Sequence, residues 1–179
     1  MTRAEGARRP RPRPAPGEDG EAGPARQDPG GEPEIRPMRP EDLPQVAEIE
    51  RAAFSVPWRE TTFRRLLSHE RTRAWSAVDR DGAVAGYAIM WFTENGAQLG
   101  NLAVAEAHRR RGLGRRLVRT ALESVRDADA ADYLILEVRE SNEAAIALYR
   151  GLGFRLLGRR SEYYRSPPED ALVMGLDAR

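Results

Sequence analysis

Apolar residues recur at three- and four-residue intervals in several parts of the chain, which predicts amphipathic helices there. The clearest such helix follows residue 112, where one face collects Leu113, Leu117, Ala121, Leu122 and Val125. Further helices are predicted over residues 40–54, behind a Pro-Glu-Asp start, over 57–69, opened by Pro57, and over 141–153.

Short apolar runs bounded by turn residues predict strands at residues 34–38, 73–78, 83–92, 97–104, 132–138, from Phe154 onward and 171–176. Residues 161–170 are predicted to be a polar loop. The run 132–138 is apolar on both faces, as expected in the middle of a sheet. The element order β-α-α-β-β-β-α-β-α-β-β predicts an α/β protein with a mixed sheet of about seven strands and flanking helices. Its early strands are antiparallel, and one parallel crossover joins residues 97–104 to 132–138.

Residues 1–33 consist largely of Pro, Gly, Arg and acidic residues. Such a segment buries too little apolar surface to offset its ordering entropy, so we predict a disordered extension before one domain at 34–179. The run RPRPRPAP within it also suits a polyproline II ligand for a partner.

Composition excludes several classes of function. The chain has 29 basic and 28 acidic residues, no Lys, no Cys and two His. A Schiff-base lysine, a cysteine nucleophile and a thiolate or multi-histidine metal site are therefore excluded, and no metal is expected. Neither a signal peptide nor an apolar run of roughly 20 residues is present, so we expect a cytoplasmic protein that binds no membrane and no nucleic acid directly.

The stretch HRRRGLGRR, residues 108–116, lies between a predicted strand and a predicted helix. Its pattern, Arg109-x-x-Gly112-x-Gly114, suits an anion, because glycines at both positions permit positive φ and bring backbone N–H groups of a helix start close to a phosphate. A dinucleotide fingerprint fits poorly because Leu117 replaces the third glycine, and a Walker loop lacks its Lys. A solvated arginine turn remains open as the alternative.

Two longer stretches carry a specific resemblance. NLAVAEAHRRRGLGRRLV resembles the acyl-CoA motif of the GNAT N-acetyltransferase superfamily, and LEVRESNEAAIALYRGLGF resembles its second motif. Together with AAFSVPWRETTF and Tyr163-Tyr164, they are most similar to the ribosomal-protein-alanine N-acetyltransferases (RimI type). The resemblance implies a GNAT fold, splayed between its two central parallel strands, that uses acetyl-CoA.

The resemblance also implies roles for single residues. The strand backbone at Leu102, Ala103 and Val104 would pair with pantetheine and supply an N–H to the thioester oxygen. The loop would hold the pyrophosphate, and Asn142 would contact CoA or, alternatively, only start a helix. The implied CoA-binding set is Leu102, Ala103, Val104, Arg109, Arg110, Arg111, Gly112, Leu113, Gly114, Arg115 and Asn142.

Glu137 and Tyr149 are the candidate catalytic residues. Glu137 lies near the end of an otherwise apolar strand, where a carboxylate is costly unless it is paired or used in chemistry. From spacing alone, a structural salt bridge to an Arg explains Glu137 equally well. For Tyr149, a role as a core aromatic residue is the simpler explanation. The resemblance implies that Glu137 is the general base and Tyr149 the general acid.

The expected reaction is direct transfer in a ternary complex, from acetyl-CoA to an N-terminal alanine of ribosomal small-subunit protein eighteen. The alternatives are acetylation of a small amine or a lysine side chain, and a non-catalytic acetyl-CoA-binding module. Trp58, Tyr163 and Tyr164 are candidates to line the acceptor groove, and a monomer or weak dimer is expected.

Overall fold

The computed structural model describes residues 31–94, 96–127 and 131–178. Residues 31–179 form one compact unit, and the predicted disordered extension lies, up to residue 30, outside the described residues. The helices are α1 (Leu43–Ala53), α2 (Glu60–Leu67), α3 (Leu113–Asp127) and α4 (Glu143–Arg150), with 3-10 turns at Pro40–Asp42 and Glu106–His108. The strands are β1 (Glu34–Pro37), β2 (Thr72–Val78), β3 (Val84–Phe92), β4 (Ala97–Val104), β5 (Tyr133–Arg139), β6 (Arg155–Arg165) and β7 (Pro168–Asp177).

All strands belong to one seven-stranded sheet with the order β1-β2-β3-β4-β5-β7-β6. The β4–β5 pair is parallel and the other pairs are antiparallel. The predicted α/β class, element order and single parallel crossover are thereby confirmed.

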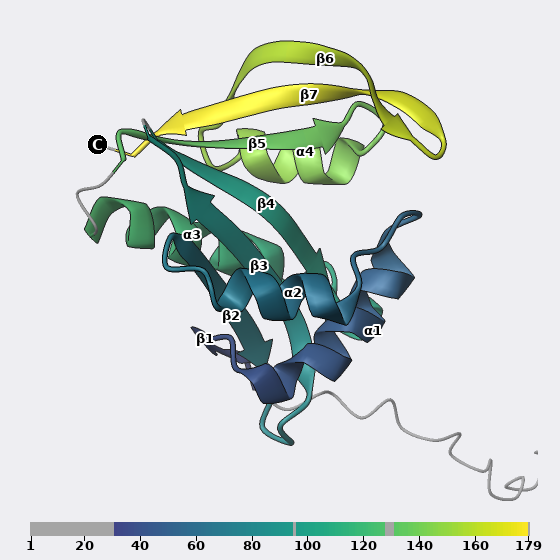
Figure 1. Cartoon of the computed structure of the whole chain (residues 1–179), viewed down its shortest axis with the longest axis vertical. Helices are drawn as coiled ribbons and strands as arrows, with labels where there is room; N and C mark the ends of the chain where they lie inside the picture. Colours follow the sequence, from purple (N-terminus) through teal and green to yellow (C-terminus); the bar gives the residue numbers. More distant parts are fainter. Residues whose placement is uncertain (1–30, 95, 128–130, 179) are drawn as a thin grey trace, which may run out of the picture. The chain divides into compact units, whose positions relative to one another are not determined.

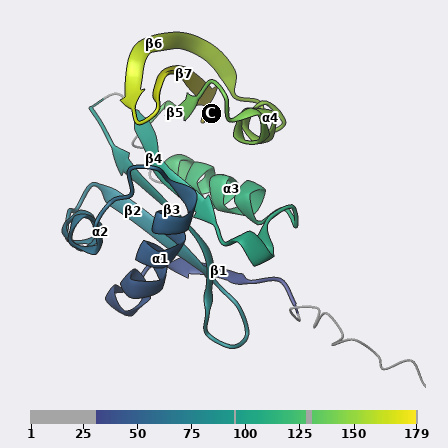
Figure 2. The same cartoon turned by 90° about the vertical axis from the view of Figure 1, so that its right-hand side faces the viewer.

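The helices cover both faces of the sheet (Figure 2). On one face, α1 and α2 bury Leu43, Val46 and Phe63 against β3. On the other, α3 and α4 share a second apolar cluster with the buried residues of β5, in which Leu117, Leu134 and Tyr149 take part. The amphipathic spacing of α3 accounts for its place there, because each of its periodic apolar residues is buried.

The predicted splay between the two parallel strands is present (Figure 1). β4 pairs with β5 only where Ala97–Leu99 faces Leu134–Leu136, and beyond these residues the two strands diverge. The register of β4 against β3 also shifts here, leaving Gly100 as an extra residue between Leu99 and Asn101. A Cβ at residue 100 would clash with the Trp91 ring, so a larger residue at this bulge would have to displace that side chain.

Two predicted boundaries are wrong. α2 begins at Glu60 rather than at Pro57, because Arg59 is extended (φ −78°, ψ 153°) and the Trp58 backbone N–H donates to the Glu50 carboxylate instead of entering a helix. Most of the predicted loop 161–170 is strand, since β6 and β7 pair across it around a bulge at which Glu162 has a φ of 51°.

Candidate functional site

The loop between β4 and α3 brings backbone N–H groups to the start of a long helix. Two of its residues have positive φ, Arg110 (62°) and Gly112 (81°). Gly114 is different, because it lies inside α3 and a Cβ there would be 3.3 Å from Leu148 of α4. Positive φ was predicted at both glycines; the structure has it at Gly112, whereas Gly114 allows α3 and α4 to approach closely.

The arginines of this loop divide into two groups. Arg109 donates from Nε to the Val104 carbonyl at 3.0 Å, and Arg115 donates to the Gly151 carbonyl at 3.0 Å, so both connect the loop to its surroundings. Arg110 and Arg111 are exposed. The positive end of the α3 dipole and these cations favour an anion at the loop.

The divergence of β4 from β5 leaves one backbone edge of β4 facing the opening. Leu102 and Ala103 pair with Ala88 and Tyr87 of β3 on their other side. The wedge between the strands therefore offers backbone groups for hydrogen bonding next to an anion-binding helix start. This arrangement fits a pantetheine arm joined to a pyrophosphate, which is the shape of CoA.

Gly112 offers a direct test of the loop. Because its φ is 81° and a Cβ there would touch nothing within 4 Å, Gly112→Ala changes backbone preference without a clash. We expect a KM for acetyl-CoA raised on the order of tenfold, since an L-residue disfavours the loop by roughly 1–2 kcal/mol, with kcat changed little. Steady-state kinetics checks this. Gly82→Ala, at φ 83° with equally open space, is the matched control and should leave this KM unchanged.

Glu137 lies on β5 just beyond the last residues that pair with β4. Its side chain is 10% exposed, and both carboxylate oxygens are engaged: Gln98 Nε2 donates to Oε2 at 2.7 Å and Arg160 Nη1 donates to Oε1 at 2.8 Å. The salt bridge to an Arg, which was the alternative predicted for Glu137, is thus present in the structure. Arg160 is half-exposed, so Oε1 of Glu137 is paired with a side chain that reaches the surface.

Tyr149 is a buried residue of α4, and its ring lies 5.6 Å from that of Phe154. Burial raises the pKa of its hydroxyl to about 12, with a smaller contribution from Tyr164. Burial also raises the pKa of Tyr164 to about 12, an effect that Tyr163 and Glu137 strengthen and Arg139 opposes. Tyr164 therefore interacts electrostatically with both Tyr149 and Glu137, and Tyr149 carries its proton at neutral pH.

Asn142 stands directly before α4, and its Oδ1 accepts the Ala145 backbone N–H at 3.1 Å. In the structure Asn142 therefore caps the start of α4, which was the alternative role predicted for it.

Arg139, at the end of β5, joins the α1–α2 turn to the β6–β7 turn. It donates to the Ser166 carbonyl at 2.9 Å and to Glu169 at 3.0 Å, and its guanidinium lies 4.1 Å from the centre of the Tyr164 ring. Ser55 Oγ donates to the same Ser166 carbonyl at 2.5 Å. These contacts hold the α1–α2 turn against the β6–β7 turn.

A comparison with protein families shows to which family the chain belongs. The model of the acetyltransferase (GNAT) family matches residues 43–154, which span α1 to α4 and the whole splayed region. The chain belongs to the GNAT family. It is an acetyl-CoA-dependent N-acetyltransferase.

Individual relatives agree with this assignment. A putative ribosomal protein bS18-alanine N-acetyltransferase of Bacillus subtilis is 38% identical over 140 residues, covering 78% of this chain and 92% of the relative. The bS18-alanine N-acetyltransferase of Escherichia coli K12 is 37% identical over 145 residues, covering 79% of this chain and 95% of the relative. The crystal structure of the Escherichia coli enzyme matches with a TM-score of 0.74 at 36% identity, over 81% of this chain and 93% of that one. The crystal structure of Arabidopsis thaliana NAA60 in complex with acetyl-CoA, which is 20% identical, shares the fold with a TM-score of 0.71. The match covers 80% of this chain and 97% of that one.

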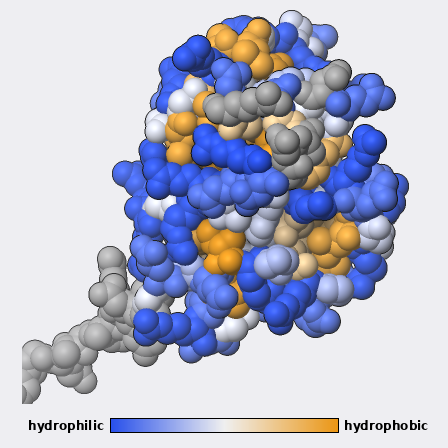
Figure 3. Space-filling model, turned by 90° about the vertical axis from the view of Figure 1, so that its left-hand side faces the viewer, coloured by the Kyte–Doolittle hydropathy of each residue, from blue (hydrophilic) through white to orange (hydrophobic). Residues whose placement is uncertain are grey.

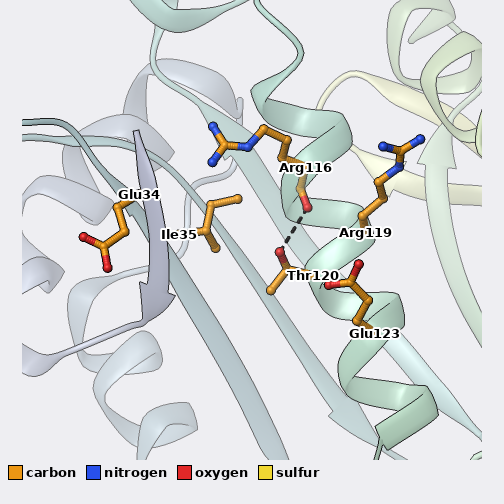
Figure 4. Close-up of a pocket in the computed structure, with 6 residues that line it drawn as sticks. All are labelled: Glu34, Ile35, Arg116, Arg119, Thr120 and Glu123. Carbon is orange, nitrogen blue, oxygen red and sulfur yellow. Dashed lines mark hydrogen bonds between the residues drawn. The ribbon is translucent and has the colours of Figure 1, made fainter. Parts of the chain in front are cut away.

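Other features of the described residues lie apart from this site. A hollow between β1 and α3, lined by Glu34, Ile35, Arg116, Arg119, Thr120 and Glu123, includes none of the predicted site residues (Figure 4). Among residues 31–94, 96–127 and 131–178, no group of three or more His, Asp or Glu side chains could hold a metal ion. In the same part of the chain no helix is long and apolar enough to cross a membrane.

Sequence reasoning missed Gln98, Arg160 and Arg139. Gln98 and Arg160 reach Glu137 from 39 and 23 residues away in the sequence, so local patterns carry no sign of them. Gln98 offered one signal, as a polar residue near the start of a largely apolar strand.

Proposed function

We propose that the chain acetylates the α-amine of an N-terminal alanine, and that its acceptor is ribosomal small-subunit protein bS18. The similarity to two bS18-alanine N-acetyltransferases carries this proposal, because it extends over 92% and 95% of their lengths. The position of Glu137, on β5 just beyond the residues that pair with β4, supports it.

In the proposed reaction, Glu137 removes a proton from the acceptor's α-ammonium, directly or through a water, after the ammonium displaces Arg160 from Oε1. The free amine then attacks the thioester carbonyl and a C–N bond forms. As the tetrahedral intermediate collapses, the C–S bond breaks and the nitrogen loses its second proton to water. Tyr149 gives its proton to the departing thiolate and regains one from solvent, while Glu137 releases its proton. No acyl-enzyme is required, and the chain has no Cys to form one by way of a thiol.

The remaining residues of the proposed site bind and orient. Backbone N–H groups at Leu102–Val104 stabilise the oxyanion, an interaction typically worth a few kcal/mol. The amides of Arg110–Arg115 and their arginine side chains hold the pyrophosphate, with Asn142 beside CoA.

The acceptor chain lies in the proposed site between the α1–α2 turn and the β6–β7 hairpin. Among the described residues, the exposed large apolar side chains include Phe54 and Val56 of the turn and Tyr163 of the hairpin, whereas Leu156 and Leu157 lie at the far end of the hairpin, opposite Met174 and Gly175. The face drawn in Figure 3 is largely hydrophilic, and apolar side chains gather on it in separate patches. The rings of Tyr163 and Tyr164 have their centres 5.1 Å apart. Together with Trp58, they complete the aromatic lining that we propose.

A comparison of acceptors tests this function. We expect acetyl transfer to a peptide that begins with the bS18 N-terminal alanine, with kcat/KM at least about 100-fold above that for the same peptide blocked at its N-terminus and carrying a Lys. A free small amine should react as poorly as the blocked peptide. A preference for the lysine or for the small amine would contradict the proposal and favour the corresponding alternative.

A further inference from the structure

Glu50 is a carboxylate in the interior of the domain that the proposed chemistry does not use. It lies on α1 among Val46 and Ile49, and the residue is only 1% exposed. Such burial is costly for a carboxylate unless its oxygens are fully hydrogen-bonded. Glu50 therefore requires its own explanation.

Neutral donors from three other parts of the chain converge on Glu50. The Trp58 backbone N–H donates to Oε1 at 2.9 Å, and Asn101 Nδ2 lies 3.1 Å from both oxygens. The Tyr87 hydroxyl donates to Oε2. Burial, with the charge of Glu50 as the second cause, raises the pKa of Tyr87 far above its ordinary value, so this hydroxyl keeps its proton.

The donors belong to the parts of the molecule that have to meet during the reaction. Trp58 lies in the α1–α2 turn, residues 54–59, which also carries the exposed side chains of Phe54 and Val56. Asn101 lies on β4 between the Gly100 bulge and Leu102. One carboxylate thus connects the turn to the strand that borders the wedge.

The contact lies in an extended stretch of backbone. Arg59 is extended and α2 begins at Glu60, directly after the Trp58 N–H that donates to Glu50. An apolar side chain in place of Glu50 would fill the core without the cost of burying a carboxylate, but it would leave this N–H without its partner. The presence of a carboxylate at residue 50 is therefore better explained by its bond to the α1–α2 turn than by packing in the core.

We propose that Glu50 is a positioning residue that holds the α1–α2 turn at a fixed place relative to the acyl-binding segment of β4. The inference rests on the proposed function, in which an acceptor peptide binds to this turn. Glu50 touches neither substrate. It acts through Trp58 and Asn101, so its loss affects acceptor binding before it affects acetyl-CoA.

The test is Glu50→Gln, which keeps the size of the side chain but turns an –NH₂ group toward other donors. We expect the KM for the alanine peptide to rise on the order of tenfold while the KM for acetyl-CoA stays within about twofold. The Trp58 amide should exchange its hydrogen on the order of tenfold faster, measured without any substrate. Asn101→Ala removes the β4 side of the connection and should raise the peptide KM likewise, which keeps the test valid if the Gln variant does not fold.

Tyr87→Phe is the matched control. It removes one donor from the same carboxylate but leaves the bonds to Trp58 and Asn101, so it should lower thermal stability without changing the peptide KM. A folded Glu50→Gln or Asn101→Ala variant with an unchanged peptide KM and unchanged Trp58 exchange would overturn the inference, as would equal changes in both KM values. If the wild type does not acetylate the alanine peptide, the proposed function fails, and the Trp58 exchange of the variants decides on the positioning role alone.

Discussion

Glu137→Gln is expected to lower kcat for the alanine peptide on the order of 100-fold or more, which corresponds to roughly 2.7 kcal/mol of activation free energy. The neutral amide retains the shape of the carboxylate but cannot accept the proton from the ammonium. Binding of acetyl-CoA, measured by calorimetry, should stay within about twofold, because the backbone of β4 and the loop that we propose to bind CoA is unchanged.

Glu140→Gln is the matched control for this substitution. Glu140 lies three residues further along, is 44% exposed at its side chain and pairs with Arg159 in the same way that Glu137 pairs with Arg160. We expect this variant to keep wild-type kcat, since its carboxylate takes no part in the proposed reaction. Equal kcat values for the wild type and Glu137→Gln would show that Glu137 serves only in its salt bridge.

Tyr149→Phe is expected to lower kcat to a similar degree, on the order of 100-fold, because the thiolate then leaves without a proton donor. The variant keeps the ring that packs against Phe154, so the fold and the acetyl-CoA affinity should be preserved. Tyr133→Phe, at the opposite end of β5 from Glu137, controls for the loss of a tyrosine hydroxyl and should leave kcat unchanged. If Tyr149→Phe keeps wild-type kcat, Tyr149 is only a core aromatic.

The raised pKa of Tyr149 has a consequence for pH dependence. The acid works in its protonated form, and a pKa of about 12 keeps that form populated as pH rises. The single-turnover rate should therefore show no alkaline decline between roughly pH 7 and pH 10, where an ordinary tyrosine would already be half ionised. A decline with its midpoint below about pH 10 in the wild type would argue against Tyr149 as the acid.

The fold could be predicted from sequence wherever the pattern reflects local packing. β4 was predicted at its observed bounds, and α3 shows the expected buried stripe, because strict periodicity selects the face that meets the core. The start of α2 was predicted wrongly because a proline rule was applied to a segment that is extended at Arg59 and makes a long-range bond from Trp58 to Glu50. Long-range contacts of this kind leave no trace in local propensity.

The candidate site divides in the same way. Glu137 and Tyr149 were chosen by resemblance to a family motif, and their catalytic roles remain predictions that the substitutions above address. Glu50 did carry a local signal, because a charged residue four positions after Val46 falls on the apolar face of α1. The partners of Glu50 and Glu137 come from distant strands and could be found only from the structure.

Tandem mass spectrometry of bS18 tests the central claim most directly. Purified bS18 with an N-terminal alanine is incubated with acetyl-CoA and either the wild-type chain or Glu137→Gln. The account predicts one acetyl group on the α-nitrogen of the alanine with the wild type and almost none with the variant in the same time. Acetylation confined to lysine side chains, or the same α-acetylation by both proteins, would contradict it.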